Sequence, residues 1–272
     1  MKPPHRSPLD LDHEEQQARL AELRARFDHN TGRLWLTPDG LKLWLDASVE
    51  THPLSRLDAS SRTEAERLHA HGLLTEDGDV PENARPAVEA VRNALCTFDI
   101  EAAVGPAPRH FRAWIGHECA VLFRSDPPWA GVEPTAEAMA SHQTPPGQRR
   151  ELRIVPRDWP PVAAARWVML TPRRVFEPLT LTVPAELFHR RLVDHTTPPP
   201  DDAHPRLVEI WNEPMFTWGL TVSPTTDTVL VLDAGNAGHR QVVADGEQVV
   251  LHALPSLALW NGIVDMLERA LN

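Results

Sequence analysis

Residues 216–271, FTWGLTVSPTTDTVLVLDAGNAGHRQVVADGEQVVLHALPSLALWNGIVDMLERAL, decide the fold that this sequence predicts. Four short runs rich in Val, Leu, Trp and Thr predict strands over residues 216–222, 228–232, 239–243 and 248–252. Asp245-Gly246 separates the last two runs, and this pair favours the positive φ angles of a tight hairpin turn. After Pro255, apolar residues recur at helical spacing to the end of the chain. The stretch is therefore predicted to be a four-stranded meander that ends in a helix.

The same order of elements occurs earlier in the chain. Runs rich in β-forming residues predict strands over 97–104, 110–115, 120–124 and 152–155, and a helix over 159–170 follows them. The segments LWLTP at 34–38 and LTLTVP at 179–184 also match, since each leads from a strand into a helix. This repetition predicts an α+β protein with pseudo-two-fold symmetry, in which two antiparallel β-meander-plus-helix halves carry flanking helices.

The N-terminal half should contain helices outside its meander. Thr37-Pro38 suits the N-cap and first position of a helix that runs to about residue 47. The alternative is a hairpin that turns at residues 38–40, because leucines alternate with other residues from 41 to 45. A capping box from Ser61 to Glu64 predicts the start of a further helix, and a second helix is expected over 81–95.

The chain divides into three predicted regions. Residues 1–30 form a disordered tail and a polar helix, 31–175 the N-terminal half, and 176–272 the C-terminal half of one compact unit. Residues 125–148 carry five prolines and predict an exposed excursion. The joint between the halves is expected near 171–177.

Composition limits the classes of function. The net charge of −11 argues against nucleic acid as a partner, because phosphate binding needs a basic field. No run approaches the ~18 apolar residues of a membrane span, and the first 17 residues lack the apolar core of a signal peptide. Two cysteines make no disulfide framework. We expect a cytoplasmic protein.

A cluster around residue 117 is the strongest candidate for chemistry. His117 and Cys119 point to the same side if both lie on one extended strand, and His110 is near in sequence. They would suit a Cys/His-dependent hydrolase or transferase. The sequence lacks Cys-x-x-Cys, His-Glu-x-x-His and Gly-x-Ser-x-Gly. A histidine at a strand edge beside a buried thiol explains the cluster better, so we expect no catalytic residue, no metal and no cofactor.

Four segments together resemble the EspG family, the cytosolic chaperones of type VII (ESX) secretion in actinobacteria. They are LTPDGLKLWLDAS at 36–48, ERLHAHGLLTEDGDV at 66–80, CTFDIEAAV at 96–104 and the final meander from VLVLDAG to the last helix. The resemblance implies a quasi-two-fold mixed α/β fold with no catalytic site. It also implies that the chain binds the apolar tip of a helical PE–PPE substrate pair and keeps that pair soluble for export.

The chain departs from the family pattern at two places, where the segment 184–214 is shorter and broken by prolines and the excursion at 125–148 is longer. The family's substrate groove involves C-terminal helices beside the sheet. Large apolar residues on this part of the chain are therefore the expected partner-binding residues. They are Phe188, Leu192, Trp211, Phe216 and Trp218. A regulatory or immunity-type binding module on the same fold stays open, as does a homodimer.

Overall fold

The computed structural model of the chain describes residues 34–50, 56–103, 108–128, 149–173, 175–177 and 179–272. Its strands are β1 Leu34–Leu36, β2 Cys96–Ala103, β3 Arg109–Ile115, β4 Cys119–Arg124, β5 Arg150–Pro156, β6 Thr180–Pro184, β7 Phe216–Ser223, β8 Asp227–Asp233, β9 His239–Asp245 and β10 Gln248–Leu254. Its α-helices are α2 Pro38–Asp46, α3 Ala59–Ala70, α4 Arg85–Arg92, α6 Pro160–Trp167, α7 Ala185–Val193, α8 Pro205–Asn212 and α9 Ser256–Leu271. The short 3-10 helices η2 Glu82–Ala84 and η3 Gly235–Ala237 complete the described elements.

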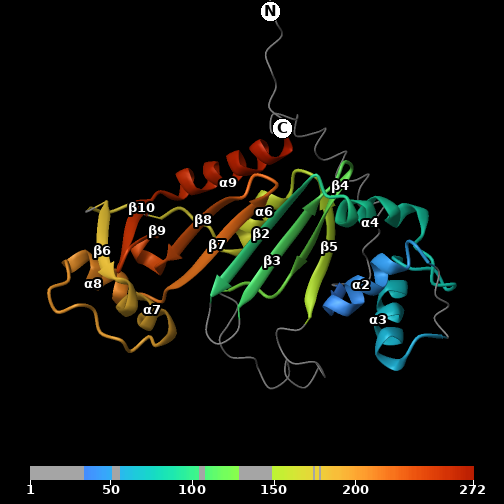
Figure 1. Cartoon of the computed structure of the whole chain (residues 1–272), viewed down its shortest axis with the longest axis horizontal. Helices are drawn as coiled ribbons and strands as arrows, with labels where there is room; N and C mark the ends of the chain where they lie inside the picture. The colour runs from blue at the N-terminus through green and yellow to red at the C-terminus, as the bar shows by residue number, and fades with distance from the viewer. Residues whose placement is uncertain (1–33, 51–55, 104–107, 129–148, 174, 178) are drawn as a thin grey trace, which may run out of the picture.

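These strands form one ten-stranded antiparallel sheet in the described part of the chain (Figure 1). The order across the sheet is β1-β5-β4-β3-β2-β7-β8-β9-β10-β6. Both meanders are present with the expected hairpins, and Gly246 takes a positive φ of 60° between β9 and β10. The predicted α+β class is confirmed.

The pseudo-two-fold relation appears in the order of the strands. β2 and β7 pair antiparallel at the centre, where Ile100 lies opposite Leu220. From this pair each half extends outward through three more strands of its meander, and each ends at a short edge strand, β1 or β6, that precedes the meander in sequence. The helices α6 and α9 follow the two meanders in equivalent places. The predicted symmetry is therefore confirmed, while the domain limits stay a prediction.

One face of the central strands carries the largest apolar core. Alternate residues of β2, β3 and β7 point into it, and α6 and α9 cover it from the other side. Its largest side chains are Phe98, Phe111, Trp167 and Trp218, each at most 1% exposed. Trp167 packs against Phe111 with ring centroids 5.8 Å apart, and its indole N–H donates to the Ser125 carbonyl at 3.0 Å. Each half contributes both strands and a helix to this core, so it holds the halves together.

The opposite face carries two separate cores at its sides. Helices α2, α3 and α4 cover β1, β4 and β5, where Trp44 and Phe123 are buried. Helices α7 and α8 cover β6 and the outer strands β8 to β10, where Phe188 and Trp211 are buried. The two helix groups stand apart to the right and left of the sheet in Figure 1, with β2, β3 and β7 between them.

The structure settles the local alternatives of the N-terminal half. Residues 38–46 are helical and the Thr37 hydroxyl accepts the Gly40 N–H at 3.0 Å, so the alternative hairpin is wrong. Helix α3 begins earlier than the capping box predicts, because Asp58 caps it by accepting the Ser61 N–H at 2.8 Å. The predicted tail and polar helix over 1–30 lie outside the described residues, as does most of the excursion, from residue 129 to 148.

Candidate functional site

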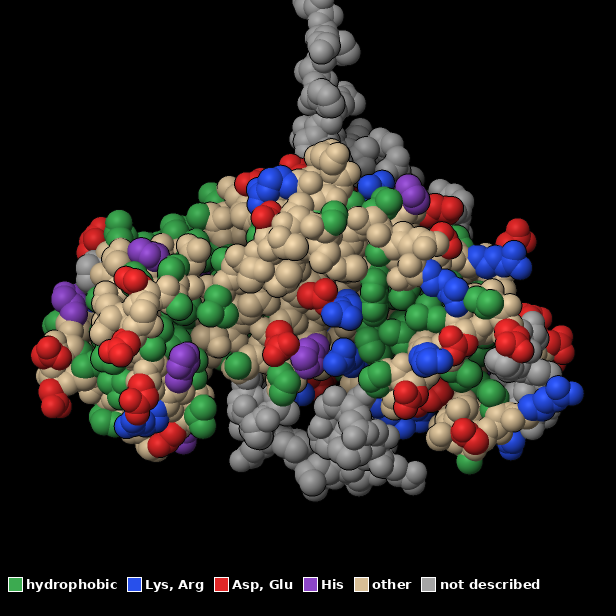
Figure 2. All heavy atoms as spheres, in the orientation of Figure 1, with side chains coloured by type: hydrophobic (Ala, Val, Ile, Leu, Met, Phe, Trp, Pro, Cys, Tyr) green, Lys and Arg blue, Asp and Glu red, His purple; other side chains and the backbone are tan. Residues whose placement is uncertain are grey.

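An uncovered part of the sheet lies between the two helix groups, on the side opposite α6 and α9. We call it the open face, and define it by the residues of β2, β3, β7 and β8 that point to this side. They are Thr97, Asp99, Glu101, His110, Arg112, Trp114, Gly219, Thr221, Thr228 and Leu230. All are exposed or half-buried, and Trp114 also packs against the core under α2, α3 and α4. Figure 2 shows charged side chains over β2 and β3, beside hydrophobic ones toward β4 and β5.

Charges and aromatic rings are interleaved at the N-terminal side of the open face. Asp99 forms an ion pair with Arg112, whose guanidinium lies 5.7 Å from the Trp114 ring centroid. Next to them, the Arg150 guanidinium lies 5.5 Å from the ring centroid of Phe123. Each arginine thus gains a cation–π contact, and the rings keep part of their faces shielded from water.

The imidazole of His110 belongs to the same group. Its Nδ1 lies 3.8 Å from Glu101 Oε2. Burial and then the charge of Arg150 lower the pKa of His110 below its usual value. Burial and then the charge of Arg112 lower the pKa of Arg150. The carboxylates of Glu101 and Asp99 act on the His110 pKa in the opposite direction, and Asp99 does so on the Arg150 pKa, so acidic and basic groups are interleaved at this part of the open face.

The C-terminal side of the open face has a different composition. Thr221 and Thr228 lie opposite each other, with their hydroxyl oxygens 3.3 Å apart. Two pairs further along the ladder, Gly219 lies opposite Leu230, and Leu230 is 41% exposed. The surface is flat here, because a glycine and short threonines stand beside a single large apolar side chain.

The structure does not bring the five predicted partner-binding residues together. Phe188 and Trp211 are 2% and 3% exposed and belong to the core under α7 and α8. The indole N–H of Trp211 donates to the Thr197 carbonyl at 2.8 Å. Leu192 is half-buried against the same core. These three side chains hold helices α7 and α8 on the sheet, and a partner reaches the two buried ones only if that packing opens.

The other two predicted residues lie on the opposite side of the sheet. Trp218 is 1% exposed in the core under α6 and α9, and Phe216 packs against that core. Their neighbours Gly219 and Thr221 point instead to the open face, because successive side chains of a strand alternate between faces. Contact of the five residues with a partner stays a prediction.

The Cys119 site of the alternative enzyme hypothesis is a core position. Cys119 is 1% exposed beneath α4, whereas His117 is exposed in the turn between β3 and β4. Burial raises the pKa of the Cys119 thiol to about 11. At neutral pH the thiol is therefore protonated, and a nucleophilic cysteine needs its thiolate. The alternation that the sequence suggested fails because β4 begins only at Cys119.

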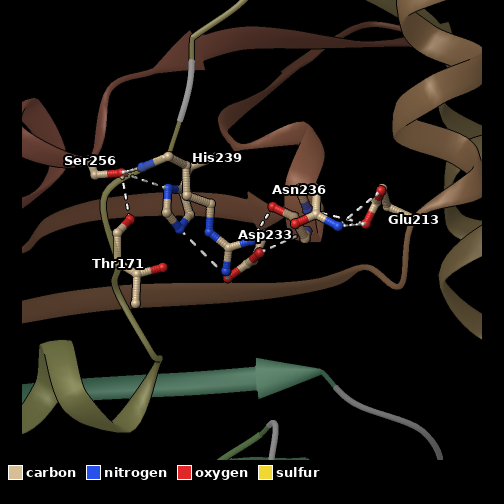
Figure 3. Close-up of polar contacts among 8 residues, drawn as sticks. Thr171, Glu213, Asp233, Asn236, His239 and Ser256 are labelled. Carbon is tan, nitrogen blue, oxygen red and sulfur yellow. Dashed lines mark hydrogen bonds and ion pairs between the residues drawn. The ribbon is translucent and has the colours of Figure 1, made fainter.

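A polar cluster that sequence reasoning missed lies where the link between the halves crosses the C-terminal half (Figure 3). Asp233 and His239 are buried at 3% and 4% exposure. The Arg173 guanidinium donates to Asp233 Oδ2 at 3.1 Å and also to the Gly235 carbonyl. Ser256, the first residue of α9, donates its hydroxyl to the Thr171 carbonyl at 2.8 Å.

The cluster contains a serine, a histidine and an aspartate, which invites comparison with a catalytic triad. The Ser256 hydroxyl is 3.4 Å from His239 Nδ1, and His239 Nε2 is 3.6 Å from Asp233 Oδ2. The second distance exceeds a hydrogen bond, and the serine proton points to Thr171 rather than to the imidazole. The geometry thus ties the link and the start of α9 together and does not activate Ser256 as a nucleophile.

Within the described part of the chain, no group of three or more His, Cys, Asp and Glu side chains is arranged to hold a metal ion. Among the helices described, none has both the length and the apolar composition to cross a membrane.

No protein-family model matches this chain, and no curated protein does either. Among solved structures, the chain is similar to the type VII secretion system chaperone EspG5 of Mycobacterium tuberculosis, in complex with a PE25–PPE41 dimer. The match has a TM-score of 0.49 and 11% identity, and covers 87% of this chain and 96% of that chain. A likeness of this size says nothing about function.

Proposed function

We propose that this protein is a non-enzymatic, cytoplasmic adaptor of the chaperone type. It binds the helical end of a type VII secretion substrate, a PE–PPE-like pair, on its open face and keeps that pair soluble. The observation that carries the proposal is the uncovered centre of the sheet. Helices α6 and α9 cover the opposite side of β2, β3 and β7, and on the open face the described helices cover only the flanks.

The dimensions of the open face suit a helical partner. Its four strands are separated by three inter-strand spacings of about 4.8 Å, so their axes span ~14 Å. A helix with its side chains is about 10–12 Å across, and two packed helices have axes 8–10 Å apart. The face can therefore receive one helix lying along it or the ends of two helices, with the flanking helix groups limiting movement to either side.

The composition of the open face supports a reversible contact. Leu230 supplies exposed apolar area and half-buried Trp114 adds the part of its ring that the α2–α4 core leaves uncovered, while the threonines and the Asp99–Arg112 pair keep the face wetted when it is free. Large aromatic and apolar anchors within a polar surround are typical of binding sites between proteins that also exist apart. Covering a client's apolar tip would remove the surface through which that client aggregates.

The client class rests on the sequence resemblance to EspG proteins. Only two of the five predicted partner-binding residues fit this proposed contact. Leu192 and Phe216 are half-buried and could touch a client at the margin, while Phe188, Trp211 and Trp218 support the scaffold from within.

The test is co-expression with the PE–PPE pairs of the same genome, followed by purification and calorimetry. We expect at least one pair to co-purify. Leu230→Glu should then weaken binding by about tenfold or more, because it places a desolvated charge in the contact. The matched control is Val243→Glu, since Val243 is 39% exposed on a neighbouring strand but points to the other side of the sheet.

Several outcomes would count against the proposal. The first is that the wild-type chain retains no PE–PPE pair. The second is that Leu230→Glu and Val243→Glu weaken binding equally. A third contrary result is that the chain alone dimerises and Leu230→Glu abolishes the dimer, because the open face would then be an interface between copies. Binding of a non-helical protein to the same face would favour the regulatory or immunity-type module.

A further inference from the structure

The sheet ends at β6, and this edge strand lacks most of the features that protect an edge. Figure 1 shows it as the outermost strand on the side of α7 and α8. The opposite edge, β1, has only three residues, whereas β6 has five, with no charged side chain, no bulge and a proline only at its last position. Edges that are not short, charged or bulged recruit further strands. Of the two edges, β6 is therefore the one at which another strand can be added.

The hydrogen bonds of β6 show which of its backbone groups face outward. The Ala185 N–H donates to the Glu247 carbonyl at 2.9 Å, one pair beyond the end of the β6–β10 ladder. In an antiparallel pair, hydrogen-bonded residues alternate with residues whose N–H and C=O point the other way. The odd-numbered residues of β6 therefore bond to β10. The N–H and C=O groups of Thr180 and Thr182 point away from it, where the described part of the chain has no further strand.

The sequence of this edge reads almost the same in both directions. Residues 179–183 are Leu-Thr-Leu-Thr-Val, and a proline stands on each side of them in the sequence. A two-fold axis at the central Leu181 places each residue opposite one of a similar kind in a second copy. Leucine lies opposite leucine at the axis, threonine opposite threonine on either side of it, and leucine opposite valine at the two ends. No like charges are opposed, so the edge is complementary to itself.

This register uses every outward-facing backbone group of the two threonines. The Thr180 N–H of one copy meets the Thr182 carbonyl of the other, and that Thr182 donates its own N–H to the Thr180 carbonyl. The two-fold axis repeats both bonds on its other side. Pro184 has no N–H, so the strand ends without leaving a further donor unpaired.

An exposed apolar side chain adjoins the edge. Leu179 directly precedes β6 and is 51% exposed, whereas Leu181 and Val183 are at most 6% exposed in the core under α7 and α8. In the two-fold register, Leu179 lies opposite Val183 of the second copy, at the margin of that core. The pairing therefore covers part of an apolar surface that each copy alone leaves in water.

We propose that a second copy of this chain pairs with β6 as an antiparallel strand, with the two-fold axis at Leu181. Closed two-fold dimers are the commonest form of association between identical chains. The open face lies on β2, β3, β7 and β8, and β9 and β10 separate these strands from β6. The pairing therefore uses a second surface of the molecule, and it does not depend on the proposed function.

The dimer should be weak and should strengthen with salt. Residues 179–183 bury much less than the ~800 Å² per partner of a standard interface, so we expect a Kd of about 10–100 µM. Each copy carries a net charge of −11, while the paired residues are uncharged, so salt screens the repulsion without weakening the contact. Sedimentation equilibrium of the full chain at low and high salt measures both effects. A chain that stays monomeric at about 500 µM and high salt would overturn the inference.

Leu179→Glu tests whether this edge is the interface. It places a charge in the contact and should weaken dimerisation by about tenfold or more, with an unchanged unfolding midpoint because the side chain is exposed. The matched control is Leu257→Glu, since Leu257 is 69% exposed at the start of α9. Equal weakening by the two substitutions would place the contact elsewhere.

Thr182→Pro tests the backbone pairing directly. The Thr182 N–H faces away from β10, so proline removes a donor to the second copy but no bond of the ladder within the chain. Dimerisation should weaken by about tenfold while the unfolding midpoint stays near that of the wild type. Unchanged dimerisation of this variant would contradict strand pairing at β6. If the midpoint falls, the Leu179→Glu and Leu257→Glu pair decides.

A cross-link tests the register. Thr180 of one copy and Thr182 of the other should have Cα atoms about 5.5 Å apart, which a disulfide can bridge, whereas identical threonines are about 7–8 Å apart. A mixture of the Thr180→Cys and Thr182→Cys variants, oxidised with copper–phenanthroline, should therefore give a covalent dimer that neither variant gives alone. The native Cys96 and Cys119 are buried and do not compete. No cross-link in the mixture, or a cross-link in Thr182→Cys alone, would contradict the axis at Leu181.

These results are distinguishable from failure of the proposed function. Leu230→Glu should leave the Kd of dimerisation unchanged, because Leu230 lies on the open face. If that substitution abolishes the dimer instead, the copies meet through the open face and the inference falls. If the chain dimerises through β6 but retains no PE–PPE pair, the inference stands and the proposed function falls.

Discussion

The four central strands present two faces that differ in almost every property. On the side of α6 and α9, alternate residues such as Phe98, Ile100 and Leu220 are buried to 2% exposure or less. On the open face, the residues between them are threonines, charged residues, a glycine and two large apolar side chains. The same strands therefore serve one internal core and one external surface. A strand whose second face met a missing helix would carry apolar residues on both sides, and these do not.

The difference between the two faces explains how the molecule can expose part of its sheet without aggregating. Threonine fits a strand as well as valine does but keeps a hydroxyl for water. The ion pairs on β2 and β3 add charge to the middle of the surface. Only Trp114 and Leu230 offer substantial apolar contact, so affinity for a partner rests on few residues.

The largest effect should come from the covered face. Trp167→Ala removes a fully buried indole and its hydrogen bond to Ser125, and we expect a loss of about 3–5 kcal/mol in the free energy of unfolding. Thr221→Ala, an exposed position of the open face, should change it by less than ~0.5 kcal/mol. Denaturant unfolding measures both. Similar losses for the two variants would mean that the faces are not as different as their burial indicates.

A smaller effect should distinguish the ion pairs of the two faces. Asp233 points to the covered side and pairs with Arg173, whose side chain is only 13% exposed. Asp233→Ala leaves that charge without its partner and should cost about 3 kcal/mol, the low end of the range for buried pairs because the Gly235 carbonyl still accepts from Arg173.

The comparison for this pair is Asp99→Ala on the open face. Arg112 is 49% exposed there, so water compensates its charge and the cost should stay below ~1 kcal/mol. Thermal unfolding of both variants at one pH compares their losses in the free energy of unfolding. A larger loss for Asp99→Ala than for Asp233→Ala would contradict the assignment of the two faces.

The smallest effect concerns the thiols under each face. Burial raises the pKa of both Cys96 and Cys119 to about 11, from an ordinary value of 9.0. Alkylation of the folded protein at pH 8 should therefore be slower than that of a free thiol by about two orders of magnitude. Because the folded pKa is raised, the stability that the neutral thiols contribute is full below pH 9 and declines as the pH rises toward 11. Rapid alkylation of Cys119 but not of Cys96 would show that α4 does not shield Cys119 from the reagent. It would support the alternative hypothesis of a Cys/His-dependent enzyme.

The sequence predicted the fold better than the site. Strands, hairpins and the helix after Pro255 follow from local patterns, and the repeated order of elements predicted the symmetry about the β2–β7 pair. The binding residues were sought among the large aromatic residues, and these side chains do not reveal from sequence whether they face a core or a partner. Phe188 and Trp211 look alike in either role until the helices are placed on the sheet.

The sequence of β7 contains one pattern that distinguishes the core side from the open face. Trp218 is in phase with Leu220 and Val222, which assigns it to the core, while Gly219 and Thr221 occupy the other phase. The polar phase marks the open face. The cluster of Asp233, His239 and Arg173 gave no such signal, because Arg173 is 60 residues from Asp233 and further still from His239, and only the folded link brings them together.

The central pairing of β2 with β7 has a consequence for how the chain can be cut or evolve. Each is an eight-residue strand, and each would become a bare edge with unpaired N–H and C=O groups if its half stood alone. Such an edge recruits any extended chain, including another copy of itself. A fragment that comprises only one half would thus pair its exposed strand with another chain. Expression of the two fragments together is the natural way to recover one molecule in which β2 and β7 pair.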